Sequence, residues 1–155
     1  MKVFIFLIIT SLALFGCAKE PTPSGDGSSA GSGGLELIDK VDINESDALL
    51  RDAFLNKKSN IQAQGVGTVT RLLADDNNGS RHQRFIITLA TKQTLLVAHN
   101  IDLAARIDAL KLKDVVEFYG EYEWNLDGGV IHWTHDDPLG VHINGWLRHN
   151  NILYQ

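Results

Sequence analysis

The stretch that decides the fold is DVVEFYGEYEWNLDGGVIHWTH, residues 114–135. From residue 115 to 124 apolar and polar residues alternate, as in a strand that buries one face. Asp127-Gly128 then matches a two-residue type I′ turn, whose central positions both need a positive φ. We therefore expect an antiparallel hairpin in which residues 130–135 form the second strand.

The turn also predicts how the two strands pair. A two-residue Asp-Gly turn aligns Trp124 with Ile131, Glu123 with His132, Tyr122 with Trp133 and Glu121 with Thr134. This alignment mostly matches apolar with apolar and polar with polar residues, whereas a slip by one residue would mix the faces. Trp133 is therefore expected in the core, and His132 is expected on the outer face beside Glu123.

The segments before the hairpin supply three more strands and two helices. Residues 43–59 have helical apolar spacing, with Asn44 and Ser46 as cap candidates. Residues 63–73, 81–90 and 93–100 have strand patterns, and Gly65 and Gly67 suggest a bulge or a strongly coiled strand. Residues 101–110 show helical spacing after Asn100.

This order predicts a mainly β (α+β) fold. Three strands, a short helix and two strands are the order of a five-stranded OB-like barrel, here with an added N-terminal helix. The short helix would lie between the third and fourth strands. A small open antiparallel sheet with two helices is the alternative.

The N-terminal sequence predicts an export signal. Residues 1–16 have one lysine followed by an apolar run shorter than the roughly 20 residues of a membrane span. Leu14-Phe15-Gly16-Cys17 resembles the bacterial lipobox, which implies a lipidated Cys17 that anchors the protein to a membrane. An ordinary signal peptide with an incidental cysteine is the alternative.

Three further expectations follow from this N-terminus. Ala18 lacks the aspartate associated with inner-membrane retention, which favours the outer membrane, on its periplasmic side. Residues 17–34 form a Gly/Ser-rich linker, and residues 35–155 form one globular domain. Because the chain has one cysteine, an intrachain disulfide is excluded.

The charge balance counts against a general polyanion binder. The chain has 14 Lys and Arg against 19 Asp and Glu. Removing residues 1–16 takes away only Lys2, so the mature chain carries 13 − 19 = −6. Broad nucleic-acid binding usually needs a basic surface, although a local basic patch stays open.

The densest polar cluster is VIHWTHDDPLGVHINGW, residues 130–146. Histidine and carboxylate side chains can hold a divalent metal such as zinc or act as general acids and bases. The metal candidates are His132, His135, Glu123, Asp136 and His142, and the first four are also the catalytic candidates. His135 would face away from His132 unless the strand ends near Thr134. The alternative is a solvated face with cross-strand His–Glu pairs and an Asp-shaped turn.

Four other residues are candidates for ligand binding: His82, Arg84, His99 and Trp146. Arg84 could chelate an anion, and the second and third strands of OB barrels commonly bind oligonucleotides or oligosaccharides. Trp146 could stack on a sugar or base. The alternatives are a solvated strand for His82 and Arg84, a loop hydrogen bond for His99, and packing for Trp146.

RHQRFIITLA, LLVAHNIDLAARI, VEFYGEYEWN and VIHWTHDDPLGVHINGWLRHN together resemble an exported bacterial family known as a domain of unknown function. The resemblance covers residues 54–155 and implies the domain boundary and an exported location, without a mechanism. The family pattern tends to have a second histidine after His135, where this chain has Asp136. This departure weakens any mechanism that needs two adjacent histidines.

Three functions remain open. The first is a tethered envelope module that binds an anionic or sugar-containing ligand, such as a glycan or nucleic acid, or a protein partner. The second is a His/Arg-dependent phosphodiesterase or nuclease-like hydrolase, with or without a metal. The third is a structural envelope protein. Because no complete catalytic constellation is visible, we favour binding; convergence of His82, Arg84, His132, His135 and an acid in one pocket would favour the enzyme.

Overall fold

The computed structural model describes residues 42–155. The predicted signal peptide, Cys17 and linker lie outside the described residues. The elements are α1 (Ile43–Leu55), β1 (Ile61–Leu72), β2 (His82–Thr88), β3 (Thr94–Asn100), β4 (Val115–Glu123), β5 (Val130–His132), β6 (Trp146–His149) and β7 (Ile152–Tyr154). Within residues 42–155, no helix has the length and apolar character that a membrane span needs.

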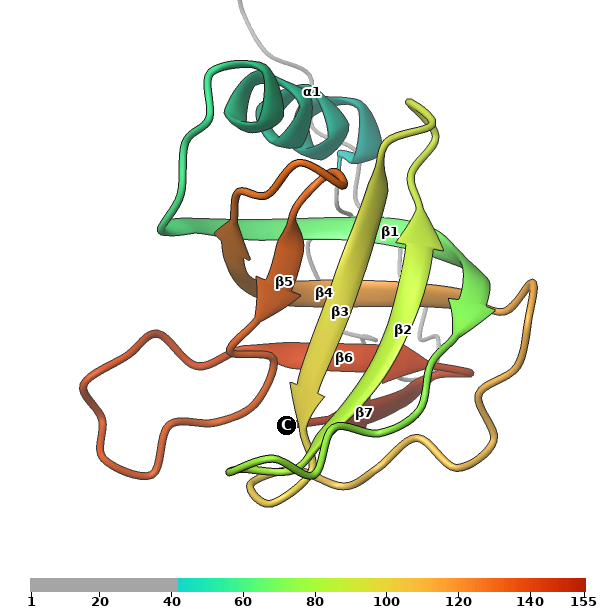
Figure 1. The fold of residues 1–155 in the computed structure, drawn as a ribbon, viewed down its shortest axis with the longest axis vertical. Helices are drawn as coiled ribbons and strands as arrows, with labels where there is room; N and C mark the ends of the chain where they lie inside the picture. The colour runs from blue at the N-terminus through green and yellow to red at the C-terminus, as the bar shows by residue number, and fades with distance from the viewer. Residues whose placement is uncertain (1–41) are drawn as a thin grey trace, which may run out of the picture. The chain divides into compact units, whose positions relative to one another are not determined.

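The first five strands close into a barrel. They hydrogen-bond in the order β1-β2-β3-β5-β4, and β4 also pairs with β1. β1 serves both sides because its first part, Ile61 to Thr68, pairs with β4, while Thr68 to Leu72 pairs with β2. The β3–β5 pair is parallel. In Figure 1, β2 and β3 cross in front of β1 and β4. The OB-like barrel is thus confirmed, and the open sheet is excluded.

Two strands follow the barrel and extend its sheet. β5 pairs with residues 121–123 of β4, and β6 pairs with residues 116–119. β5 and β6 therefore follow one another along β4, and residues 133–145 form a loop between them. β7 returns antiparallel to β6 through Asn150 and Asn151, which both have positive φ and so suit a two-residue hairpin turn.

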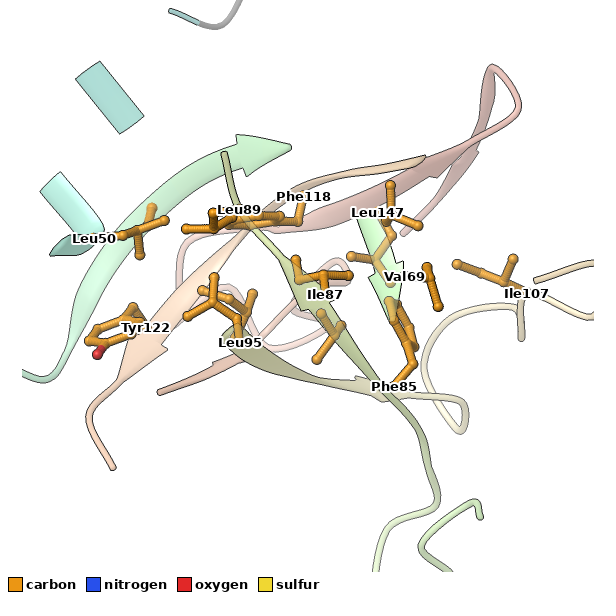
Figure 2. Close-up of a cluster of buried hydrophobic side chains, with 14 of the residues drawn as sticks. Leu50, Val69, Phe85, Ile87, Leu89, Leu95, Ile107, Phe118, Tyr122 and Leu147 are labelled. Carbon is orange, nitrogen blue, oxygen red and sulfur yellow. The ribbon is translucent and has the colours of Figure 1, made fainter. Parts of the chain in front are cut away.

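The barrel interior is filled by alternate residues of its strands. Phe85 and Ile87 of β2 and Phe118 and Tyr122 of β4 are fully buried, and Figure 2 shows them in one cluster. Gly65 faces this interior because a Cβ there would lie 2.6 Å from the ring of Phe118. The glycines of β1 thus make room for large side chains, and the strand's irregularity falls between Val69 and Arg71.

The two ends of the core are closed differently. Leu50 of α1 lies at one end of the cluster and Ile107 at the other (Figure 2). α1 begins after Asp42, whose side chain accepts hydrogen bonds from the backbone of Asn44 and Glu45. The predicted caps, Asn44 and Ser46, were wrong because both lie inside the helix.

The predicted short helix between β3 and β4 does not form, and residues 101–114 are a succession of turns. The Gln83 side chain accepts a hydrogen bond from the Ile107 backbone N–H at 2.9 Å and donates one to its carbonyl at 3.0 Å. An α-helix would use both of these backbone groups internally. The loop therefore places Ile107 in the core without helical structure, while Leu103 stays 46% exposed.

The predicted β4–β5 register was wrong by two residues. Glu121 pairs with His132, Tyr122 with Ile131 and Glu123 with Val130. Trp124 leaves the ladder, because its backbone N–H donates to Ser59 Oγ and its ring N–H donates to the Phe54 carbonyl. The connection is therefore a six-residue loop, residues 124–129, in which Gly128 and Gly129 have positive φ. Because the register differs from the prediction by an even number of residues, each side chain of the β4–β5 pair still lies on the predicted face of the sheet.

Trp133 was predicted to be a core residue and is half-buried instead. Its φ is +50°, so the chain turns out of the strand direction directly after β5. The indole ring stacks on His142, with ring centroids 4.1 Å apart and planes 8° apart. A bulky residue in this backbone region is strained, and the stacking helps to hold it there.

Candidate functional site

Two neighbouring strands bring two carboxylates and an imidazole together. Glu121 and Glu123 are two residues apart on β4 and so share its outer face. His132 of β5 lies opposite Glu121. One potential ligand atom from each of these three side chains lies within 4.8 Å of the others. We call Glu121, Glu123 and His132 the Glu–His cluster.

One ring nitrogen of His132 lacks a hydrogen-bond partner in this position. Its Nε2 atom is shielded from solvent and has no hydrogen-bond partner, although it lies 3.4 Å from Glu121 Oε1. A buried polar atom without a partner costs about 1–3 kcal/mol. Burial lowers the pKa of His132, and the nearby charges of Glu121 and Glu123 offset only part of that effect. A neutral imidazole with its proton on Nδ1 presents Nε2 as an acceptor or ligand atom.

His142 holds the other side of Glu121. Its Nε2 lies 2.6 Å from Glu121 Oε2, and its Nδ1 lies 2.8 Å from the Ile143 carbonyl. Because both partners are acceptors, both nitrogens donate best when the ring is protonated. Burial opposes this charge, but the Glu121 hydrogen bond and its charge outweigh burial and raise the pKa of His142. Burial likewise opposes ionisation of Glu121, and the His142 hydrogen bond nevertheless lowers its pKa.

The loop that carries His142 is fixed by one aspartate. Asp137 accepts hydrogen bonds from the backbone N–H groups of Leu139, Val141 and His142 at 2.7–2.9 Å. These bonds lower the pKa of Asp137. Asp137 therefore shapes a turn, as the sequence alternative proposed for this pair of aspartates. The turn sets His142 against the ring of Trp133.

A small pocket of about 180 Å³ lies next to the Glu–His cluster and shares His132 with it. His82 of β2 and His135 also line this pocket, together with Trp133 and Asn100. His82 Nδ1 lies 2.8 Å from the Ser80 carbonyl, and His135 Nδ1 lies 2.7 Å from the Asp136 carbonyl. Because a carbonyl only accepts, Nδ1 carries the proton in each neutral ring and Nε2 keeps a lone pair. We call this the histidine pocket.

A larger groove of about 600 Å³ lies farther along the same outer face of β2 and β3. Ile86 of β2 and Leu96 of β3 form part of its floor, Arg71 of β1 lines it, and Asn125 and Asp127 line it from the β4–β5 loop. The register of β2 and β3 runs from Ile86–Leu96 in this groove to His82–Asn100 in the histidine pocket. A four-residue step along a strand covers about 13 Å. One extended ligand could therefore contact both hollows.

The sequence profile of a family described as "protein of unknown function (DUF3465)" matches residues 35–155. The chain belongs to this family. A search of curated proteins found no match. The DUF3465 match covers the whole barrel described above, as well as β6 and β7.

Three of the sequence candidates lie apart from this site in the DUF3465 barrel. Arg84 donates to the Ala74 carbonyl at 3.1 and 3.2 Å and lies 3.6 Å from Asp76. His99 is fully buried with both ring nitrogens hydrogen-bonded, so it offers no surface to a ligand. Trp146 lies on β6 with Arg148 placed 5.0 Å over its ring, consistent with a packing role. The ligand-binding roles of Arg84 and Trp146 stay predictions.

All but one of the remaining candidates belong to the cluster, contact it or line the pocket. Glu123 and His132 belong to the Glu–His cluster, His142 contacts it through Glu121, and His135 lines the histidine pocket. Asp136 is exposed and belongs to neither group. Sequence reasoning missed Glu121 as a candidate because the predicted register placed it opposite Thr134. The alternation of β4 already put Glu121 beside Glu123 and was the signal that could have found it.

Proposed function

We propose that this protein is a lipid-anchored envelope protein that binds a sugar-containing ligand along the outer face of β2 and β3. The observation that carries the proposal is the 600 Å³ groove between the β1–β2 connection and the β4–β5 loop. In OB barrels this is the face that commonly binds oligosaccharides and oligonucleotides. Anchoring rests on the lipobox at Cys17 and on the export signal before it.

The charges around the groove favour a sugar over a polyanion. Arg71 is the one basic residue among those lining the groove, where Asp127 adds an opposite charge, and the neighbouring Arg84 is occupied by Asp76 and a backbone carbonyl. A polyanion would therefore meet few free cations here. Aliphatic side chains such as Ile86 and Leu96 stand beside hydroxyl and amide groups. Such a lining suits a ligand that has both C–H surfaces and hydroxyl groups.

A charge placed in the groove tests this assignment. Ile86→Lys should weaken binding of neutral envelope oligosaccharides at least about tenfold, because the lysine fills the floor and must be desolvated. Titration calorimetry with defined oligosaccharide fragments measures the change. Val66→Lys places the same charge on the outer face of β1, outside the groove, and should leave the affinity unchanged.

The same pair of variants distinguishes the other ligands. If Ile86→Lys tightens binding of an anionic polymer in a salt-dependent way, the ligand is anionic and the sugar assignment is wrong. If both lysine variants bind oligosaccharides like the wild type, the groove is not the binding surface.

A hydrolase is the second candidate, and the histidine pocket is the observation that favours it. His82 and His135 both line the pocket with their Nδ1 atoms bound to backbone carbonyls, and His132 joins the pocket to two carboxylates. A base and an acid beside a charge stabiliser are the parts that phosphodiester hydrolysis needs. Arg84 lies outside the pocket, so the predicted constellation converges only in part. Phosphodiester turnover that disappears in His135→Gln would favour this function over binding alone.

A further inference from the structure

We propose that Glu121, Glu123 and His132 bind one divalent transition-metal ion, zinc or an ion of similar preference. The inference goes beyond ligand binding in the groove, and the two sites share no residue. It rests on the geometry of the Glu–His cluster, on its charge and on its hydrogen bonding.

The donor atoms suit this class of metal. Two carboxylates and one imidazole are ligands that zinc accepts, and they leave a coordination position for water or substrate. Tetrahedral zinc with bonds of about 2.1 Å separates its ligand atoms by roughly 3.4 Å. The cluster atoms lie within 4.8 Å of one another, so small side-chain rotations close the difference. Calcium and magnesium prefer more ligands, all of them oxygen.

The negative charge of the two carboxylates in the cluster also favours binding of a cation. Among residues 42–155, no lysine or arginine forms an ion pair with Glu121 or Glu123. The nearby Glu117, four residues before Glu121 on β4, is by contrast paired with Arg148 at 2.9 Å. Within residues 42–155, the groups within ion-pairing distance of Glu121 are the imidazoles of His132 and His142, and no basic group forms an ion pair with Glu123.

The hydrogen bonds leave the inner ligand atoms free. His142 occupies Glu121 Oε2, while Oε1 faces His132 Nε2 at 3.4 Å. That nitrogen is shielded from solvent and has no hydrogen-bond partner, which a metal would supply. A second group that holds a ligating carboxylate is a regular feature of metal sites. His142 therefore orients Glu121 toward the metal position.

Calorimetric titration of the purified, untagged protein with zinc chloride tests the proposal. The wild type should saturate at one zinc per chain. Glu123→Gln removes a ligand with little change of shape and should weaken binding by at least roughly 10- to 100-fold, the loss typical when an outer partner of a metal ligand is removed. Glu117→Gln is the matched control on the same face of β4 and should bind zinc like the wild type.

Thermal unfolding gives a second readout that does not depend on activity. Zinc should raise the melting temperature of the wild type and of Glu117→Gln, because it binds only the folded state, and should not raise that of Glu123→Gln. Equal melting temperatures of the three proteins without zinc would show that the variants are folded. If Glu123→Gln is destabilised, His132→Gln replaces it in the same comparison.

Three results would overturn the proposal: a wild type that does not saturate at one zinc per chain, a Glu123→Gln variant that binds like the wild type, or binding that depends on His135 but not on Glu123. None of these results bears on the groove. Failure of the metal site and failure of oligosaccharide binding are therefore separately visible.

Discussion

His99 is a buried histidine whose two ring nitrogens join separate parts of the chain. Nδ1 lies 2.8 Å from the Thr134 hydroxyl, and Nε2 lies 3.2 Å from the Ala105 carbonyl. In the neutral ring Nε2 donates to the carbonyl and Nδ1 accepts from the hydroxyl. Burial lowers the pKa of His99 to about 4. His99 thus fastens the β3–β4 connection to the segment after β5.

This pKa predicts a pH-dependent part of the stability. Unfolded His99 binds a proton near its ordinary pKa of about 6.5, while the folded ring stays neutral down to about 4. The contribution is therefore full above pH 6.5 and is lost as the pH falls toward 4. Between pH 7.5 and 5 the loss should be roughly 2 kcal/mol.

Urea unfolding of the wild type and of His99→Gln at several pH values measures this term. The stability difference between the two proteins should shrink by that amount on acidification, because glutamine does not titrate. A difference that stays constant from pH 7.5 to 5 would mean that His99 is not a buried neutral ring.

At the scale of elements, the strand faces could be predicted because alternation has a period of two and survives any even shift. Phe85 and Ile87 are buried as the pattern indicated, and Glu123 and His132 share the outer face. The β4–β5 register could not be predicted from the turn motif. Its determinants are the Ser59 and Phe54 groups that bind Trp124, more than 60 residues away in the chain.

The candidate site was predictable to the same extent. The residue types and the outer face of Glu123 and His132 follow from local pattern. The position of His142 does not follow from local pattern, because it depends on the turn that Asp137 shapes and on the stacking of His142 on Trp133. The backbone of Trp133, at φ +50°, likewise departs from the strand pattern that the sequence suggested. The predicted helix of residues 101–110 is absent for a similar, non-local reason. The Gln83 side chain hydrogen-bonds the backbone N–H and carbonyl of Ile107, which a helix would use internally.

On the scale of the whole molecule, structural and candidate functional groups lie on opposite faces of the same strands. The inner faces carry the apolar core and His99, while the outer faces carry the groove, the histidine pocket and the Glu–His cluster. This division follows from closing the barrel, which buries one face of every strand and leaves the other accessible. A tether at Cys17 would hold that accessible surface close to the membrane.

The proposed tether gives a prediction for the intact protein. Cys17→Ala removes the only residue that can be lipidated within the lipobox, so the protein should move from the membrane fraction to the soluble fraction of the envelope. Immunoblotting of fractionated cells measures the shift, and Ala18→Ser is a control that keeps the cysteine. If the Cys17→Ala protein stays with the membranes through a high-salt wash, the lipid assignment is wrong.

The position of β5 between β3 and β4 in the closed barrel creates both the Glu–His cluster and the histidine pocket. Ile131 reports on it directly, because it pairs with Val97 on one side and with Tyr122 on the other. Cross-strand nuclear Overhauser effects in the NMR spectrum of the protein measure these neighbours. We expect backbone contacts from Ile131 to Val97 and to Tyr122. Contacts to Trp124 in place of Tyr122, with none to β3, would contradict this position of β5.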